Sequence, residues 1–430
     1  MRIAMMTNNY KPFVGGVPIS VEHLAKGLRK KGHEVCIFAP QYEGSTEDKE
    51  EEDIVRYRSC EKRLKNKMVI PNIMDPVISR EFEKRSFDLI HVHQPMLIGN
   101  VAMHLSRKHQ IPLVYTYHTR YEEYLHYIGM FSDEKCQKMM RRYLREKGKK
   151  LLPKYLNAYA NHCDLVIAPS SDLRNYLYQQ KIKTPVCVLP TGLSDFAYEK
   201  CKESSDRIRR EYLGEGKYLL CTVSRMDKEK NLYFLLDCIG KIREQAGDLV
   251  KVLFIGEGAE KEALWQYAKE KGLSDTVIFT GGVPNREVRE YLGACDAFLF
   301  SSKSETQGIV LAEAMAAGLP VTAVSACGVN DIVEDGKNGY LAKEDPQAYA
   351  KKVLTMLERE EDYKRLKRGA KMTAQNYRME DIAAQAEQYY QQALWQYDGQ
   401  NFKERKTAYG YEAVEKKHVK SSVLRLFKMS

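Results

Sequence analysis

Residues 297–320 decide the fold of this chain, and they read AFLFSSKSETQGIVLAEAMAAGLP. The first four residues are all apolar and predict a short buried strand. Leu311 to Ala317 are good helix formers, and Gly318-Leu319-Pro320 after them predicts the end of a helix. The stretch is therefore a strand, a polar loop and a helix, which is the unit from which parallel α/β sheets are built.

The polar loop of this unit is a candidate binding site. Residues Thr306 to Ile309 lie at the start of the helix, where free backbone N–H groups and the positive end of the helix dipole favour an anion or sugar hydroxyls. Glu305 lies just before the helix and Glu313 about two turns inside it, so that two acceptors could face one ligand. An ordinary first-turn glutamate followed by a solvated helix glutamate would give the same isolated pair.

The surroundings of the two glutamates resemble the signature of the family-4 retaining glycosyltransferases, in which two glutamates are separated by seven residues. They include Ser-x-x-Glu-x-x-Gly at residues 302–308 and Ala-Gly-Leu-Pro-Val at residues 317–321, and the resemblance extends over nearly the whole chain up to about residue 397. It implies a GT-B fold, in which two Rossmann-like parallel-sheet α/β domains face a central cleft.

The resemblance also implies roles for the residues of this loop. Glu313 would accept hydrogen bonds from the ribose of a nucleotide sugar, and Glu305 would bind the sugar itself. The start of the helix, at Gly308, Ile309 and Val310, would contribute to binding of the same nucleotide sugar.

Strands and helices alternate along the rest of the chain in the same way. In the first half, strands are predicted at residues 2–7, 35–39, 89–92, 113–117, 165–168 and 186–189, with a helix at residues 20–31. In the second half, strands are predicted at residues 219–224, 251–255, 277–280, 297–300 and 320–324, with helices at residues 233–245 and 260–271. We therefore expect an N-terminal acceptor-side domain (1–194), a C-terminal nucleotide-sugar-binding domain (195–373), by the resemblance a helix that returns to the first domain (374–397), and a basic tail (398–430).

Length and composition are those of a globular protein with two domains. The chain has 430 residues, 43% of them hydrophobic, and a net charge of +10. Its ten cysteines are scattered singly without metal-finger spacing, and we expect them to be reduced thiols. The first residues enter a strand directly, and no apolar stretch approaches the ~20 residues that cross a bilayer, so we expect a cytoplasmic-side protein.

Arg225 and Lys230 are the candidates for binding a diphosphate. Arg225 follows a predicted strand, and Lys230 comes five residues later near the start of a helix. A fixed guanidinium and an ammonium from one loop could clamp two phosphates, although surface charges on a connecting loop have the same appearance. The resemblance assigns both residues to the diphosphate of the nucleotide sugar, which is the leaving group, and hence to catalysis.

Three further loops follow predicted strands. Gly15 and Gly16 allow the backbone to approach a phosphate or a sugar closely, although an ordinary turn explains them equally well. By the resemblance, this loop closes over the reaction centre, the loop at Gly256 flanks the nucleoside, and the backbone around Val283 meets the base.

His118 follows a predicted strand, and its imidazole could point into the cleft. A single histidine is more often structural than catalytic, but the resembling family places a histidine next to the sugar at this position. We therefore expect His118 to orient the sugar and to support positive charge. His91 and His93 form an H-x-H pair with no third ligand, and no Asp-x-Asp lies in a metal-binding context, so we expect no metal and no cofactor.

The string His-Thr-x-Tyr-Glu-x-Tyr-x-x-Tyr, which begins at His118, is similar to the subgroup that glucosylates diacylglycerol in Gram-positive bacteria. Residues 135–154 after it contain nine Lys and Arg and one Glu, with an apolar stripe at helical spacing. Such a helix suits an anionic membrane surface, but it could equally pack its stripe on the protein and leave its charges in water. The expected membrane and acceptor residues are Tyr121, Lys138, Arg141, Arg142 and Arg145.

These features predict transfer of glucose, with retention, from UDP-glucose to diacylglycerol or a glycolipid, by a protein bound peripherally to the inner face of the cell membrane. A different acceptor, such as a phosphoinositide, a polyprenyl-linked glycan or a soluble small molecule, is an alternative, as is a sugar-nucleotide-binding protein without turnover. The net charge taken alone would favour nucleic acid, but no zinc-finger spacing or RNA-binding signature accompanies it, so we expect no nucleic-acid partner.

Overall fold

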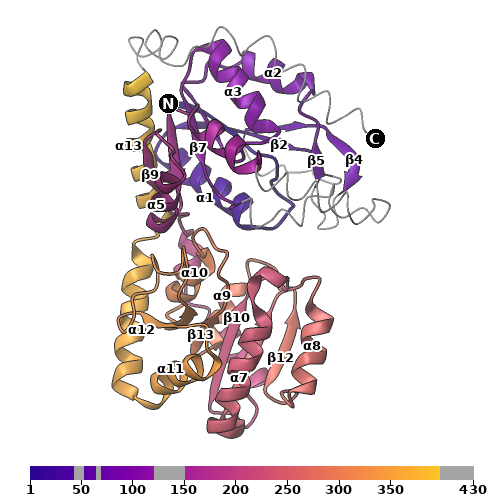
Figure 1. The fold of residues 1–430 in the computed structure, drawn as a ribbon, viewed down its shortest axis with the longest axis vertical. Coiled ribbons are helices and arrows are strands. Elements are labelled where there is room, and N and C mark those ends of the chain that lie inside the picture. Colours follow the sequence, from indigo (N-terminus) through magenta and orange to yellow (C-terminus); the bar gives the residue numbers. More distant parts are fainter. Residues whose placement is uncertain (43–52, 64–68, 121–150, 398–430) are drawn as a thin grey trace.

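Two parallel β-sheets, one in each half of the chain, organise the computed structural model, which describes residues 1–42, 53–63, 69–120 and 151–397. The two domains are stacked along the long axis of the molecule and are joined along one side (Figure 1). The strands of the first sheet end at Val188 and those of the second begin at Tyr218, so residues 194 and 195, the predicted boundary, lie in the segment between them. The prediction of an α/β protein with two Rossmann-like domains is confirmed.

The N-terminal sheet has seven parallel strands in the order β3-β2-β1-β6-β7-β8-β9. Its strands are short apolar runs because helices cover both faces: α1 and α13 pack on one face, and α2, α3 and α5 on the other. The strands are β1 (Arg2–Met6), β2 (Glu34–Pro40), β3 (Ile54–Tyr57), β6 (Leu89–Val92), β7 (Leu113–Thr116), β8 (Leu165–Ala168) and β9 (Val186–Val188). The helices are α1 (Gly16–Lys30), α2 (Pro76–Glu83), α3 (Ile98–His109), α5 (Ser171–Gln179) and α13 (Met379–Tyr397), and β4 (Ser59–Arg63) and β5 (Val69–Pro71) form a separate hairpin.

The C-terminal sheet repeats the plan with six parallel strands in the order β12-β11-β10-β13-β14-β15. Helices α7, α8 and α11 pack on one face and α6, α9 and α10 on the other, and α12 contributes residues to the core on both faces. The strands are β10 (Tyr218–Val223), β11 (Val250–Ile255), β12 (Val277–Gly281), β13 (Ala297–Phe300), β14 (Val321–Val324) and β15 (Gly339–Ala342). The helices are α6 (Lys202–Leu213), α7 (Leu232–Ala246), α8 (Lys261–Glu270), α9 (Val288–Ala294), α10 (Ile309–Ala316), α11 (Pro346–Glu358) and α12 (Glu360–Gln375).

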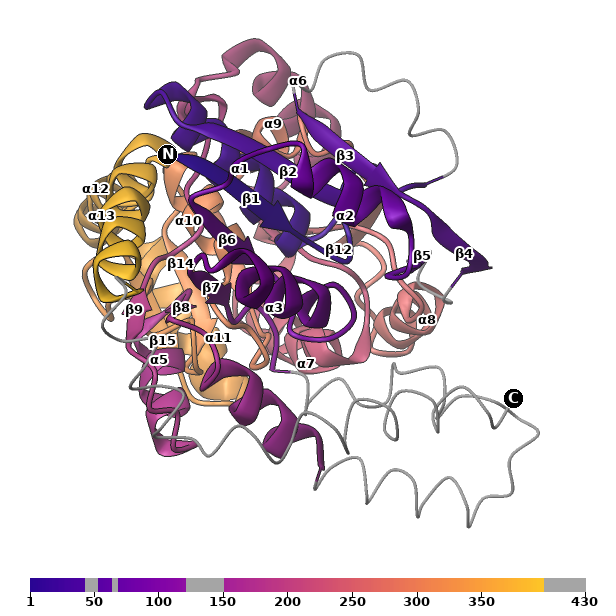
Figure 2. The same cartoon turned by 90° about the horizontal axis from the view of Figure 1, so that it is seen from above.

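Helices α12 and α13 run along the same side of the molecule, α12 beside the C-terminal domain and α13 beside the N-terminal domain (Figures 1 and 2). The returning helix expected at residues 374–397 corresponds to α13, which packs on the N-terminal domain but begins five residues later, at Met379, because α12 ends only at Gln375. Between them, the N–H of Leu193 donates to the carbonyl of Tyr377 at 2.6 Å, and the N–H of Met379 donates to the carbonyl of Leu193 at 2.9 Å. The backbone therefore bonds to the segment that joins the domains instead of continuing a helix.

Helix α1 begins at Gly16, four residues before its predicted start at residue 20. Pro18 falls in the first turn of this helix, where the missing N–H of a proline is not needed. The glycine pair that the sequence suggested as a loop is therefore split, because Gly15 lies outside the helix and Gly16 is its first residue.

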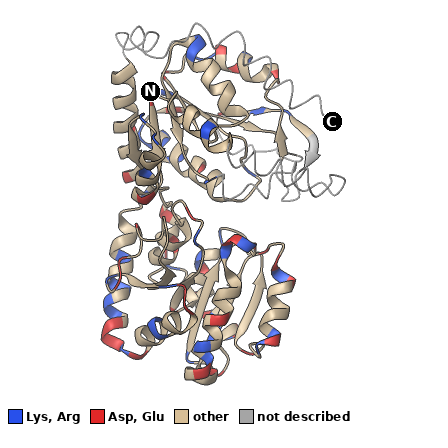
Figure 3. Ribbon diagram, in the orientation of Figure 1, with Lys and Arg blue, Asp and Glu red and all other residues tan. Residues whose placement is uncertain are grey.

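Charged residues occur on the helices of both domains (Figure 3). Many form ion pairs between neighbouring turns, such as Lys364 with Glu360 at 2.7 Å and Arg365 with Asp362 at 2.7 Å on α12. Exposed pairs of this kind contribute little to stability. In the part of the chain that the structure describes, no helix combines the length and the apolar character needed to cross a lipid bilayer.

Candidate active site

Neighbouring strands bring the predicted diphosphate-binding and sugar-binding loops together. Strand β10 pairs in parallel with β13, with Leu220 opposite Ala297, so the loops that leave their carboxyl ends are adjacent. Lys230 lies in a short 3-10 turn after β10, and Glu305 lies in the loop after β13. The Nζ atom of Lys230 donates to Oε1 of Glu305 at 2.6 Å.

Hydrogen bonds from the surrounding loops hold both members of this ion pair. The hydroxyl of Ser302 donates to Oε1 of Glu305 at 2.9 Å, and the hydroxyl of Ser301 donates to the carbonyl of Lys230 at 2.8 Å. The next residue, Asn231, has a φ of 56° and turns the chain into α7. The side chains of Lys230 and Glu305 are 13% and 21% exposed, so the pair is largely shielded from water but not sealed.

Glu305 is ionised in this arrangement. Burial alone would raise the pKa of Glu305, but the ammonium of Lys230 outweighs burial, and the hydroxyl of Ser302 and the charge of Arg225 act in the same direction. The pKa therefore lies below its usual range. When a ligand binds, the ammonium can bind a phosphate in place of the carboxylate. The carboxylate can then accept a hydrogen bond from a ligand hydroxyl in place of the ammonium.

Arg225 leaves the carboxyl end of β10 and is fixed by two carboxylates of its own loop. One guanidinium nitrogen lies 2.9 Å from Asp227, and the other lies 3.0 Å from Glu229. The carboxylate side chains are 13% and 8% exposed, whereas that of Arg225 is 48% exposed. The guanidinium is thus oriented from behind while its outer edge stays open to a ligand.

Glu313 lies one turn inside α10, not two as the sequence suggested, because the helix already begins at Ile309. Burial raises the pKa of Glu313 to about 7. The residue is partly buried. In the described part of the chain, its carboxyl group has no hydrogen-bond or ion-pair partner. An unpaired acceptor of this kind at the base of the loop is suited to the hydroxyls of a ligand.

At two of the four predicted glycine positions, a side chain would clash with the backbone or would strain it. At Gly256, which has a φ of 142°, a Cβ atom would lie 2.0 Å from the carbonyl oxygen of Ser224, directly before Arg225. Gly308 caps α10 with a φ of 75°, in the left-handed region. Gly15 has an extended φ of 176°, which any residue adopts, and a Cβ there would lie 3.2 Å from the ring of Phe13, whereas a Cβ at Gly16 would meet nothing within 4 Å.

His118 follows β7 and contacts the loop at residues 305–308 across the domain boundary. The hydroxyl of Thr306 donates to the carbonyl of His118 at 2.8 Å. The Nε2 atom of His118 lies 2.9 Å from Nδ1 of His93, which follows the adjacent strand β6. Burial lowers the pKa of His118 to about 3, so the ring is neutral at pH 7 and acts through hydrogen bonds.

The chain also places residues at this boundary that the sequence did not single out. The side-chain amide of Gln307 accepts from the N–H of Thr191 at 2.7 Å and donates to the carbonyl of Thr191 at 3.2 Å. The hydroxyl of Ser170 donates to the carbonyl of Thr306 at 2.6 Å. No local pattern marks these residues, because each contact joins segments more than 100 residues apart.

Val283 is the remaining predicted residue that the structure describes. Val283, in the loop after β12, is partly buried and packs against the apolar cluster of α9 and α10. Tyr121, Lys138, Arg141, Arg142 and Arg145 lie outside the described residues.

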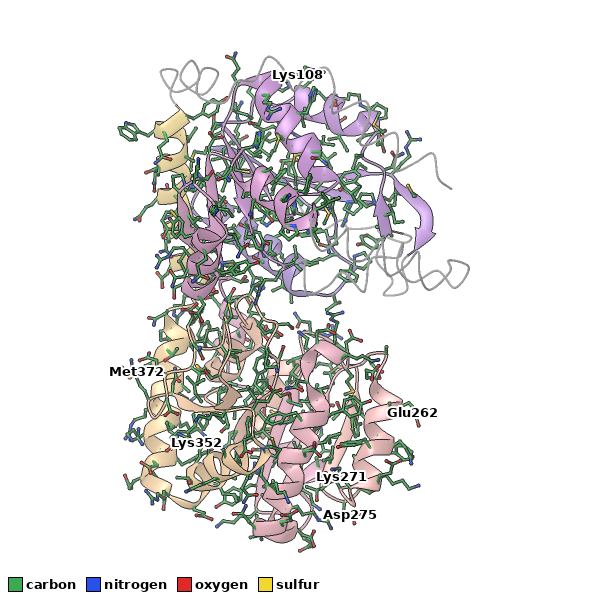
Figure 4. The ribbon with its side chains drawn as sticks, viewed as in Figure 1. Lys108, Glu262, Lys271, Asp275, Lys352 and Met372 are labelled. Atoms are coloured by element: carbon green, nitrogen blue, oxygen red, sulfur yellow. The ribbon has the colours of Figure 1, made fainter. Side chains whose placement is uncertain are left out.

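A surface hollow of about 600 Å³ between α7, α8 and α11 does not offer a competing anion site. Its Lys271 pairs with Asp237 at 2.8 Å, and its Lys241 pairs with Glu244 at 2.7 Å. Lys271 lies at the end of the C-terminal domain that faces away from the N-terminal domain (Figure 4). The third cation of the lining, Arg243, pairs with Asp248 at 3.6 Å, so each cation of the hollow has a carboxylate partner.

Two family descriptions match this chain and divide it between them. The family described as Glycosyltransferase Family 4 matches residues 14–195, and the family described as Glycosyl transferases group 1 matches residues 204–373. The first match covers most of the N-terminal domain, and the second covers most of the C-terminal domain with Arg225, Lys230, Glu305 and Glu313.

Two proteins that are similar to most of this chain have names that are more specific than the family descriptions. The chain is 28% identical over 399 residues to the alpha-monoglucosyldiacylglycerol synthase of Acholeplasma laidlawii, covering 91% of this chain and 96% of that protein. It is 32% identical over 364 residues to the alpha-monoglucosyldiacylglycerol synthase of Streptococcus pneumoniae, covering 79% of this chain and 75% of that protein. The structure of Anabaena HepE in complex with UDP and glucose is similar with a TM-score of 0.70 and covers 91% of this chain and 100% of HepE. At 20% identity, the likeness to HepE concerns the fold alone.

Proposed function

This chain belongs to glycosyltransferase family 4 and has the GT-B fold, and on that premise we propose that it transfers glucose, with retention, from UDP-glucose to diacylglycerol or a glycolipid. We place this reaction at the cytoplasmic face of the cell membrane. The observation that carries the proposal is the similarity to two alpha-monoglucosyldiacylglycerol synthases over most of the chain. Their name specifies the sugar, the lipid and an α linkage.

Lys230, Arg225 and Glu305 supply the groups that transfer from a nucleotide diphosphate requires. The leaving diphosphate has to be neutralised, and Arg225 and Lys230 approach it from one loop. When a phosphate takes the place of Glu305 beside Lys230, the carboxylate of Glu305 becomes available to the sugar hydroxyls. The N–H groups at the start of α10 and the carboxylate of Glu313 then face the rest of the nucleotide sugar.

The proposed chemistry keeps the configuration of the sugar. The anomeric carbon is α-linked to phosphate in UDP-glucose, and an α-linked product therefore requires retention. The acceptor hydroxyl attacks from the face that the diphosphate leaves: its oxygen bonds to the anomeric carbon, the bond from that carbon to the phosphate oxygen breaks, and the proton passes to the leaving phosphate. His118 orients the sugar, and no protein nucleophile is involved.

The reaction as proposed requires no metal ion, because Arg225 and Lys230 provide the positive charge at the diphosphate. The expected result is that a chelator such as EDTA leaves the transfer rate unchanged. Loss of activity with EDTA and its recovery with added Mg²⁺ would contradict this part of the proposal.

The deciding experiment is an assay with radiolabelled UDP-glucose and mixed micelles of diacylglycerol and anionic lipid, followed by lipid extraction. Labelled glycolipid is expected, and unlabelled UDP-galactose in excess should compete poorly. If UDP-glucose binds but label enters only a soluble or a different lipid acceptor, the acceptor is wrong and the family chemistry stands. If UDP-glucose binds and no acceptor is labelled, the alternative of a binding protein without turnover holds.

Membrane binding is tested separately, with the basic stretch at residues 135–154. Replacing Arg141, Arg142 and Arg145 by glutamine should weaken sedimentation with anionic vesicles and leave UDP binding intact. The matched control removes three positive charges elsewhere, at the exposed residues Arg286, Arg359 and Lys364 of the C-terminal domain. Equal loss of vesicle binding in both variants would mean that net charge alone, and not this stretch, attracts the membrane.

A further inference from the structure

Three histidines, two of them buried, form a stack beneath the candidate active site. The rings of His91 and His93 lie 4.3 Å apart, and those of His93 and His118 lie 5.2 Å apart and nearly parallel. His91 and His93 are 0% and 1% exposed, whereas His118 is partly exposed. The stack arises because β6 and β7 are neighbours in the sheet, with Val92 opposite Tyr115.

The protonation of His91 follows from its two partners. Its Nδ1 atom lies 2.7 Å from the hydroxyl of Tyr390 on α13, and its Nε2 atom lies 2.6 Å from the hydroxyl of Thr116. Burial keeps the pKa of His91 low, at about 3, so the ring is neutral and only one nitrogen carries a proton. Both ring nitrogens are satisfied, and α13 thereby fixes the far end of the stack.

His93 differs, because only one of its nitrogens has a partner. Its Nδ1 atom bonds to Nε2 of His118 at 2.9 Å, while its buried Nε2 atom has no hydrogen-bond partner in the described part of the chain. Both rings are neutral, so one of them donates and the other accepts. If His118 were to donate, the proton of His93 would sit on the buried Nε2 atom as an N–H without an acceptor.

A buried N–H without an acceptor is costlier than a nitrogen lone pair without a donor. The favoured arrangement therefore has Nδ1–H of His93 donating to Nε2 of His118. The proton of His118 must then reside on its Nδ1 atom, the ring nitrogen that the stack leaves free.

We propose that His93 is a positioning residue that locks His118 as the Nδ1–H tautomer, so that His118 presents a hydrogen-bond donor to an oxygen of the sugar. The tautomer of His118 follows from the fold alone, whereas the role of this tautomer in transfer rests on the proposed function. It assigns His118 to orienting the sugar and not to carrying positive charge.

Nitrogen-15 NMR of the protein labelled at its histidines tests the lock without any assay of activity. The long-range coupling pattern of a neutral imidazole distinguishes the two tautomers, and the signals of His118 are identified by their loss in His118→Gln. The expected spectrum at pH 7 shows the Nδ1–H tautomer of His118. The Nε2–H tautomer in the native protein would overturn the proposal at once.

Two substitutions of His93 extend the test. His93→Leu removes the donor, and His118 should then become a mixture of tautomers or the Nε2–H form. His93→Asn is the matched control, because its amide nitrogen lies near the position of Nδ1 and keeps a donor, so the Nδ1–H form should persist. An unchanged His118 tautomer in a folded His93→Leu protein would also overturn the proposal.

The kinetic consequence separates positioning from binding of the nucleotide. In His93→Leu, kcat for transfer should fall about 10- to 100-fold, because a misdirected group next to the reacting sugar costs rate. The dissociation constant of UDP should stay within about twofold, because Arg225, Lys230 and Glu313 lie in the other domain, and His93→Asn should recover most of the rate. If the lock is observed but no variant transfers glucose, the tautomer proposal stands and the proposed function fails.

Discussion

At the scale of single residues, the candidate site is built from charges that hold one another in place. Lys230 and Glu305 are 75 residues apart in the sequence, and their side chains meet at 2.6 Å. Arg225 is fixed by Asp227 and Glu229, so both cations are already ordered for the diphosphate that we propose as their ligand. Such preorganisation is the main source of electrostatic stabilisation at a leaving group.

Replacing Lys230 tests this role. Lys230→Ala should lower kcat by about 10²- to 10³-fold, since it removes one preorganised charge from the leaving diphosphate. Lys228→Ala is the matched control, because Lys228 lies two residues away, is 78% exposed and approaches Glu260 only at 3.9 Å. Rates and thermal unfolding are measured for both variants. Near-normal turnover in a folded Lys230→Ala protein would rule out the assignment to the diphosphate.

The carboxyl group of Glu313 predicts a pH dependence of substrate binding. With a pKa of about 7, it is protonated below pH 7 and ionised above, and only the ionised form offers its full set of acceptors to ribose hydroxyls. The KM for UDP-glucose should therefore fall as pH rises through about 7 and level off above. UDP-glucose is the right probe because its diphosphate does not titrate there, unlike the terminal phosphate of UDP.

Glu313→Gln provides the comparison for this pH profile. The amide does not titrate, so the KM of this variant should be nearly independent of pH. At pH 8 it should be higher than the KM of the native protein. Since the neutral His118 has a pKa of about 3, it adds no inflection near pH 7. A pH dependence that is the same in both proteins would assign the titration to another group.

At the scale of secondary-structure elements, α13 connects the end of the described chain to its beginning. It packs against α1 through Ala383 and Met379, and its Tyr390 reaches His91 under the candidate active site. The two helices approach closely because Gly27 of α1 has no side chain: a Cβ there would lie 2.7 Å from the Cβ of Ala383 and 3.0 Å from the carbonyl oxygen of Met379.

Alanine at Gly27 tests the packing of α13. Gly27→Ala should lower the free energy of unfolding by about 1–3 kcal/mol, because α13 has to move away to make room. Gly240→Ala is the matched control: Gly240 lies inside α7 with nothing within 4 Å of a Cβ, and alanine there should stabilise by roughly 0.5–1 kcal/mol. Urea unfolding measures both. Equal and small effects would mean that the contact of α1 with α13 tolerates a methyl group.

At the scale of the whole molecule, the loop at residues 305–308 belongs to the C-terminal domain but is bonded to the N-terminal domain. Thr306 bonds to His118 and Ser170, and Gln307 bonds to Thr191. The segments that cross between the domains also meet each other, through Leu193 and the backbone on either side of Arg378. The distance between Glu305 and His118 is thus set by contacts between the domains.

A change at Thr306 tests whether this domain contact matters for transfer. Thr306→Val keeps the shape of the side chain but loses the hydroxyl that donates to the carbonyl of His118. We expect kcat to fall about threefold to tenfold, which is the change that corresponds to the loss of one hydrogen bond. UDP affinity should not change. Thr306→Ser retains the hydroxyl and should remain close to the native rate. If valine and serine behave alike, the contact is not formed during the reaction.

The sequence by itself determined the class of fold and most of the loops at the site. Short apolar runs between amphipathic stretches predict buried parallel strands, because only helices on both faces of a sheet allow every strand residue to be apolar. The placement of Arg225, Glu305 and His118 after such runs predicts their position at the carboxyl ends of strands. These signals are local, so they can be read along the chain.

Only the tertiary structure decided which of these loops meet. Lys230 reaches Glu305 because β10 lies next to β13, and His93 reaches His118 because β6 lies next to β7. Strand order depends on the packing of the whole domain and leaves no local pattern. The break at residues 376–378 has the same origin, since the backbone there bonds to Leu193 in the segment between the domains. The periodicity of apolar residues indicates which residues are buried. Which groups a buried residue contacts depends on segments far away in the chain.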